Sequence, residues 1–133
     1  MWKILIAEDL PADAQKIVDG LSGIADCTVA KDGPETIDLY NKSIQKNKNF
    51  DFILLDVQLP QKNGFDILKY IRKQEESRHE DPSRESKIIM ITTHKDSLME
   101  HYNMGWDEFM SKPVDLAILK SRLNELNLTR KKS

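Results

Sequence analysis

The chain has 133 residues, of which 39% are hydrophobic and 32% are charged, and its net charge is −2 at pH 7. A chain of this length forms one domain and buries about two thirds of its unfolded surface, so it needs no disulfide or structural metal for stability. The charge balance gives no attraction for nucleic acid. The single cysteine, Cys27, excludes an internal disulfide and fits a reducing cytoplasm. No apolar run approaches the roughly 20 residues of a membrane span.

Apolar runs predict five strands that alternate with five helices. The strands are expected at residues 3–7, 28–30, 50–55, 88–91 and 108–111. Apolar residues at helical spacing place the helices near residues 11–21, 34–44, 65–71, 98–102 and 116–126. The charged residues 75–87 are expected to form a solvated loop or a frayed helix extension. Residues 1–127 are expected to form the domain, and residues 128–133 a basic, mobile tail.

The alternation of strands and helices predicts a parallel sheet that is covered by helices on both faces. The run at residues 50–55 is apolar in both alternations, as in a central strand of such a sheet. Polar residues follow four of the strands, and the carboxyl ends of parallel strands lie at one edge. These residues are Glu8-Asp9, Asp56, Thr92 and Lys112. The sequence therefore brings carboxylates, a hydroxyl and an ammonium to the same edge, where ligands of open α/β sheets bind.

This set of side chains favours magnesium and phosphoryl chemistry. Two carboxylates about 4 Å apart repel by roughly 4 kcal/mol at an effective dielectric near 20, and a divalent cation relieves that repulsion. Oxygen ligands favour Mg²⁺, and a carboxylate beside it can act as a nucleophile toward phosphorus. The ammonium of Lys112 and the hydroxyl of Thr92 would then bind phosphoryl oxygens.

With these residues in place, the sequence resembles a known family, the CheY-like receiver domains of two-component response regulators. Four motifs in the family's order carry the resemblance: Glu8-Asp9, LLDVQLPQKNG at residues 54–64, Ile91-Thr92 and FMSKP at residues 109–113. The resemblance implies a flavodoxin-like α/β/α sandwich whose five parallel strands have the order 2-1-3-4-5.

The resemblance also implies a role for each motif residue. Asp56 would accept the phosphoryl group, and Lys112 would bind it. The Mg²⁺ ligands would be Glu8 (through water), Asp9, Asp56 and the backbone carbonyl of Gln58.

Further residues are implied in switching and in phosphoryl lifetime. Thr92 would be the switch hydroxyl and Phe109 the switch aromatic, with Phe109 expected to double as a core residue. The bond before Pro113 is expected to be cis, which would aim Lys112 inward. Gln58 and His94 are expected to affect how fast water removes the phosphoryl group.

The implied function is phosphorelay signalling. A phosphohistidine on a sensor histidine kinase or a phosphotransfer protein would donate to Asp56, and the chain would act as a single-domain switch rather than as an enzyme on other substrates. Output would pass to a protein partner through the face made by the fourth helix, the fifth strand and the fifth helix. Two residues depart from the family's pattern: Phe109 stands where the family often has Tyr, and Trp106 where it usually has a small residue. We therefore expect an unusual partner at this face. The alternative is that Trp106 only fills a gap left by a shortened fourth helix.

Other readings stay open. A small phosphatase of the haloacid dehalogenase type would need a second Asp two residues after the nucleophile, whereas position 58 is Gln and position 11 is Pro. A nucleotide binder would need a glycine- or hydroxyl-rich loop after the first strand, which residues 8–13 lack. A receiver fold that is never phosphorylated and serves as a scaffold remains the third alternative.

Overall fold

The computed structural model describes residues 1–93 and 104–131 of the chain. Within these residues, five parallel strands form one sheet in the order β2-β1-β3-β4-β5, which confirms the predicted flavodoxin-like order. The strands are β1 (Trp2–Ala7), β2 (Ala25–Ala30), β3 (Phe52–Asp56), β4 (Lys87–Thr92) and β5 (Glu108–Ser111). The helices are α1 (Pro11–Gly20), α2 (Gly33–Gln45), α3 (Gly64–Ser77) and α5 (Leu116–Lys131), with a short 3₁₀ helix, η1 (Pro82–Arg84).

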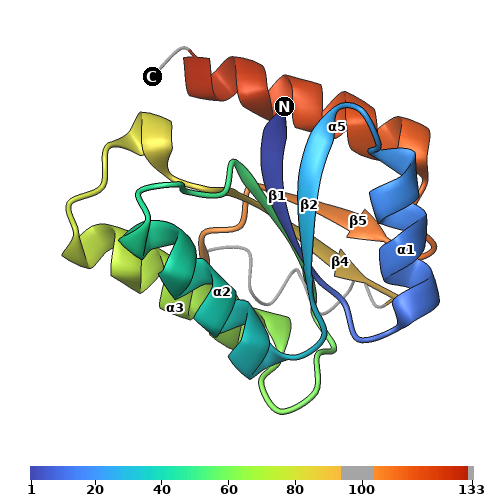
Figure 1. Cartoon of the computed structure of the whole chain (residues 1–133), viewed down its shortest axis with the longest axis horizontal. Coiled ribbons are helices and arrows are strands. Elements are labelled where there is room, and N and C mark those ends of the chain that lie inside the picture. Colours follow the sequence, from blue (N-terminus) through green and yellow to red (C-terminus); the bar gives the residue numbers. More distant parts are fainter. Residues whose placement is uncertain (94–103, 132–133) are drawn as a thin grey trace.

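The helices cover the sheet from both sides, with α2 and α3 on one face and α1 and α5 on the other (Figure 1). Successive residues of the central strand β3 point to opposite faces, so Ile53 and Leu55 join the core under α2 and α3, while Phe52 and Leu54 join the core under α1 and α5. All four side chains are fully buried. This two-sided burial confirms the prediction of a central, covered strand.

Two helix starts fix the loops that lie beside the carboxyl ends of the strands. The Asp32 carboxylate accepts a hydrogen bond from the Glu35 backbone N–H at 2.8 Å and caps α2, and the Asn63 side chain caps α3 in the same way. At Gly64 a Cβ atom would lie 2.6 Å from the carbonyl oxygen of Asp56, so only glycine lets α3 begin this close to the end of β3.

The strand boundaries differ from the prediction most at β2 and β3, while β1 and β4 are longer by one and two residues. Strand β2 begins at Ala25 rather than at residue 28, because its whole length pairs with β1 from Trp2 onward. Strand β3 begins at Phe52 and includes Asp56 as its last residue. The fourth helix expected near residues 98–102 lies outside the described residues.

Residues 75–77 continue α3, as the expected helix extension, but the charged segment 75–87 is not solvated throughout, which corrects that part of the prediction. Helix α3 continues to Ser77, η1 follows, and the side chains of Glu75 and Ser86 are 3% and 2% exposed. Glu75 accepts hydrogen bonds from Arg72 and from the Ser86 backbone N–H, so its buried charge is paired.

The last helix is longer than expected. Helix α5 reaches Lys131, so residues 128–131 of the expected tail belong to it, and the division at residue 127 remains a prediction. In the described part of the chain, none of the helices combines the length and the apolar composition that crossing a membrane requires.

Candidate functional site

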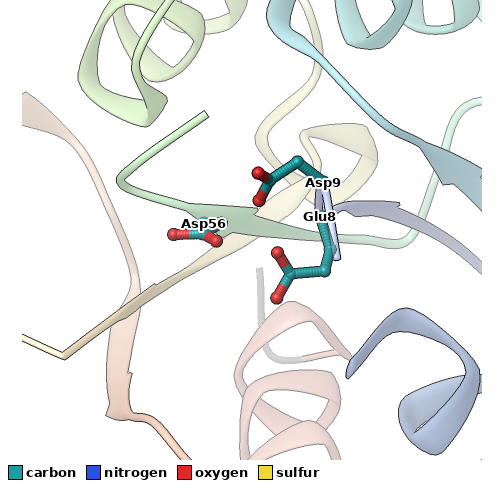
Figure 2. A group of neighbouring side chains, drawn as sticks. All are labelled: Glu8, Asp9 and Asp56. Carbon is teal, nitrogen blue, oxygen red and sulfur yellow. The ribbon is translucent and has the colours of Figure 1, made fainter. Parts of the chain in front are cut away.

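Three carboxylates lie together at the carboxyl edge of the sheet. Glu8 and Asp9 follow β1, and Asp56 ends the neighbouring strand β3 (Figure 2). Each of the three offers a carboxylate oxygen, and these oxygens lie within 4.8 Å of one another. Glu8 and Asp56 are buried, each 4% exposed. The structure therefore brings together the acidic residues that the sequence predicted.

Lys112 reaches these acids from the segment after β5. Its Nζ donates hydrogen bonds to Glu8 Oε1 at 2.6 Å and to Asp56 Oδ2 at 2.7 Å. The backbone N–H of Lys112 also donates to the carbonyl oxygen of Thr92, which extends the β4–β5 pairing by one step. The peptide bond between Lys112 and Pro113 is cis, as expected.

The close contacts change the protonation of Glu8 and Lys112. Burial raises the pKa of Glu8 to about 7; the hydrogen bond from Lys112 lowers it and the neighbouring Asp56 raises it. Burial alone would lower the pKa of Lys112, but the hydrogen bonds to Asp56 and Glu8 outweigh it and hold the pKa above its usual value. The lysine is therefore a permanent cation, whereas Glu8 is only about half ionised at neutral pH.

Thr92 ends β4 at the same edge of the sheet and is 1% exposed. The register pairs Asp56 with Ile91 and Thr92 with Ser111, which places Thr92 one step beyond the level of Asp56. Its neighbour Thr93 lines the pocket at the site. His94 lies outside the described residues.

The acids open onto a pocket of about 420 Å³. Gln58 lines this pocket, and its backbone N–H donates to Asp56 Oδ1 at 2.9 Å, which fixes the start of the β3–α3 loop on the carboxylate. Sequence reasoning missed three polar lining residues: Asp13 and Lys16 of α1, and Thr93, which follows β4. Asp13 lies 3.7 Å from Lys112 Nζ, and its position in the first turn of the helix after β1 was the available signal.

Phe109 lies on the surface, which corrects the expectation that it is also a core residue. It is 36% exposed, because the inward position of this strand belongs to Met110. Its ring packs edge-on against Trp106, with the ring centroids 5.5 Å apart. Trp106 is partly buried against the core under α2 and α3.

The donor set suits Mg²⁺. Within residues 1–93 and 104–131, Glu8, Asp9 and Asp56 supply oxygen ligands only, and hard cations of this kind are bound by one or two carboxylates together with water. The residues present therefore fit the ion that the resemblance implies. That the Gln58 carbonyl is a further ligand remains a prediction.

Comparison with known proteins places the chain in a family. Residues 4–124 match the model of the response regulator receiver domain. The chain belongs to this family. It is 32% identical over 129 residues to the transcriptional regulatory protein CiaR of Streptococcus pneumoniae, covering 95% of this chain and 51% of CiaR. It is 30% identical over 129 residues to the chemotaxis protein CheY-3 of Vibrio cholerae, covering 93% of this chain and 90% of CheY-3.

The receiver fold is also that of solved structures. The receiver domain of the Francisella response regulator 1452 has 28% sequence identity and a TM-score of 0.78, with 97% of this chain and 98% of that chain covered. The chain spans about half of CiaR, and 7% and 10% of two histidine kinases that it also matches. The match thus concerns the receiver domain, which occurs in relatives of different lengths.

Proposed function

We propose that this receiver domain accepts a phosphoryl group on Asp56 from a phosphohistidine and thereby switches a partner-binding face. The observation that supports this most directly is the pair of hydrogen bonds from Lys112 Nζ to Glu8 and Asp56. They join two strand ends and the segment after a third around one carboxylate that borders an open pocket.

In the proposed reaction, a carboxylate oxygen of Asp56 attacks the phosphorus atom. The phosphorus–nitrogen bond of the phosphohistidine breaks, and the bonding electrons leave with the imidazole. Asp56 Oδ1 already accepts the Gln58 N–H, so the carboxylate has a fixed orientation before the donor arrives. Asp56 is assigned as the phosphoacceptor because it combines a hydrogen bond from Lys112, which Glu8 also has, with one from the β3–α3 loop.

Binding of the phosphoryl group rearranges charges. The added group brings about −1.5 to −2 charges. Mg²⁺ held by Asp9, Asp56 and the Gln58 carbonyl, with Glu8 bound through water, would offset that charge. Lys112 would leave its ion pair with Asp56 for a phosphoryl oxygen, since its charge is permanent.

The switch itself would run from Thr92 to Phe109. The Thr92 hydroxyl would donate to a phosphoryl oxygen and move toward it. Phe109, now on the surface beside Trp106, would turn inward into the space that this movement leaves. The inward turn would bias an equilibrium between two shapes of the surface that includes β5 and α5, where a protein partner would read the change.

The proposed setting is the cytoplasm, with a sensor histidine kinase or a phosphotransfer protein as donor. The chain would catalyse only its own phosphoryl transfer and dephosphorylation.

The deciding experiment compares wild type with Asp56→Asn and, as a control, Asp66→Asn, whose side chain is exposed in the first turn of α3. Incubation with a small-molecule phosphodonor and Mg²⁺ should add the mass of one phosphoryl group to wild type and to Asp66→Asn, but not to Asp56→Asn. A titration with beryllofluoride and Mg²⁺, followed by amide NMR, should perturb β4 and β5 in the same two proteins. A non-phosphorylated scaffold would show neither response, and a phosphatase would release inorganic phosphate in repeated turnovers.

A further inference from the structure

The first residue of α2 touches the loop that follows the proposed phosphoacceptor strand, β3. The backbone N–H of Gly33 donates to the carbonyl oxygen of Pro60, at 3.3 Å. A Cβ atom at Gly33 would lie 2.5 Å from Lys62 Cβ and 2.9 Å from the Lys62 carbonyl oxygen. The absence of a side chain at Gly33 therefore lets the two segments approach, and any larger residue must displace residues 60–62.

The contacted part of the loop has a strained backbone. Gln61 has φ +68°, a left-handed value that residues other than glycine rarely adopt. The Lys62 N–H donates across it to the Pro60 carbonyl oxygen at 2.8 Å. A positive φ with a hydrogen bond between residues i and i+2 marks the rarer form of the γ-turn. Such a conformation persists only where its surroundings hold it, and Gly33 bonds to the same carbonyl.

The loop is anchored at both ends near the acids. The Val57 N–H donates to the Ile91 carbonyl oxygen, and the Gly64 N–H donates to the Val57 carbonyl oxygen, each at 2.9 Å. Between these anchors, Gln58 donates its N–H to Asp56 Oδ1. A displacement at residues 60–62 must therefore be taken up between the anchors, where Gln58 is the residue in contact with the carboxylate.

We propose that Gly33 is a positioning residue for the phosphorylation site, acting through Pro60 and Lys62 on Gln58. This inference rests on the proposed function, because the site that Gln58 completes is the proposed magnesium and phosphoryl site. Residues that hold metal ligands in place change metal affinity by about ten- to a hundredfold when they are replaced. We expect Gly33→Ala to weaken Mg²⁺ binding by about tenfold.

The test separates positioning from stability. Gly33 is the first residue of α2, and its φ lies outside the left-handed region, so alanine suits its backbone and favours the helix. The contacts of 2.5 Å and 2.9 Å with Lys62 oppose that gain, so Gly33→Ala is expected to lower the urea midpoint. Mg²⁺ affinity is measured by calorimetry without urea, on the folded variant, and is expected to fall; this measurement does not include the loss of stability. In the magnesium-free protein, the Gln58 amide resonance should shift.

Two further variants control for the substitution. Gly20→Ala also adds a Cβ within a helix, but that atom meets only the side chain of Leu116, outside the pocket, so Mg²⁺ affinity should stay unchanged. In Gly33→Ala/Lys62→Gly the 2.5 Å contact with Lys62 Cβ is gone and the 2.9 Å contact with the carbonyl oxygen remains, so affinity should recover in part.

A measurement on wild type keeps the test decisive if Gly33→Ala does not fold. Coupling between two sites is reciprocal, so Mg²⁺ should shift the Gly33 amide resonance with the same midpoint as that of Gln58, and leave the Gly23 amide unchanged. The inference would be overturned if folded Gly33→Ala had the Mg²⁺ affinity and the Gln58 amide shift of wild type. It would also be overturned if Mg²⁺ left the Gly33 amide resonance of wild type unshifted. A wild type that binds no Mg²⁺ would instead overturn the proposed function.

Discussion

The pKa of the Glu8 carboxyl is raised, and the free energy of unfolding should therefore depend on the pH at which this group loses its proton. Its pKa is raised to about 7 in the folded protein, above the ordinary 4.5, mainly by burial. Between these two values the folded state holds a proton that the unfolded state has lost, so the free energy of unfolding falls as the pH rises.

This gives the first prediction. In magnesium-free buffer, wild type should lose stability from about pH 4.5 to about pH 7 relative to Glu8→Gln, which has no proton to lose there. Urea unfolding at a series of pH values measures the difference between the two proteins, in which the other titrating groups cancel. Parallel pH profiles for both proteins would contradict the raised pKa.

Lys112 gives the second prediction. Replacing it by Met leaves the buried carboxylates of Glu8 and Asp56 without their cation, which should cost about 3 kcal/mol of stability at pH 8. The loss should be smaller at pH 5.5, because Glu8 then takes up a proton. Lys120→Met, at an exposed position of α5, is the control and should change stability little at either pH. Equal losses at the two pH values would contradict the role of Lys112 as counter-ion.

At the level of elements, a second ionic cluster ties α3 to the start of β5. Arg72 of α3 donates to Asp107 at 2.8 Å and to the Gly105 carbonyl oxygen at 2.9 Å, besides its bond to Glu75. Asp107 also accepts the Ile88 N–H at 2.7 Å. The cluster therefore fixes the segment that leads into the strand carrying Phe109.

The third prediction follows from this cluster. Arg72→Met should lower the free energy of unfolding by about 3 kcal/mol, because Glu75 is 3% exposed and loses its cation. Arg122→Met is the matched control: its ion pairs with Glu108 and Glu125 lie at the surface, so the change should stay below about 1 kcal/mol. Urea unfolding of both variants measures the two losses of stability. Similar losses would contradict a larger contribution from the buried cluster than from the surface ion pairs.

The same cluster explains why the sequence did not predict the burial of Glu75 and Ser86 within residues 75–87. A run of charges without an apolar member favours solvent, and nothing local shows that Glu75 will be buried. Its burial depends on Arg72 and on the Ser86 backbone, which the fold brings together. Strand β2 was predicted too short for a related reason, because its first three residues pair with β1 without forming an apolar run.

For the molecule as a whole, the site was predictable because parallel strands all end at one edge. Glu8 and Lys112 are 104 positions apart, yet the strand pattern alone placed them together. The exposure of Phe109 was not predictable from an apolar residue type, since the alternation within a four-residue strand can begin on either face.

The fourth prediction concerns the whole chain and its metal. At a hundred times its dissociation constant, Mg²⁺ should raise the free energy of unfolding by about 2.7 kcal/mol, because only the folded state brings the three acids together. Asp9→Asn should lose most of this gain. Asp38→Asn, which touches only an exposed ion pair with Lys42, should keep it. An equal gain in all three proteins would place the ion elsewhere.

The two tryptophans lie against opposite cores of the sheet. Trp2 stacks edge-on with Phe52 at 5.1 Å in the core under α1 and α5, while Trp106 does so with Phe109 beside the other core. If Phe109 turns inward, the indole of Trp106 loses its edge contact with that ring, whereas the contact between Trp2 and Phe52 stays. Tryptophan fluorescence can therefore follow activation: emission from Trp106 should change, while that from Trp2 stays constant and serves as the reference. The emission of a Trp106→Phe variant should not change on activation.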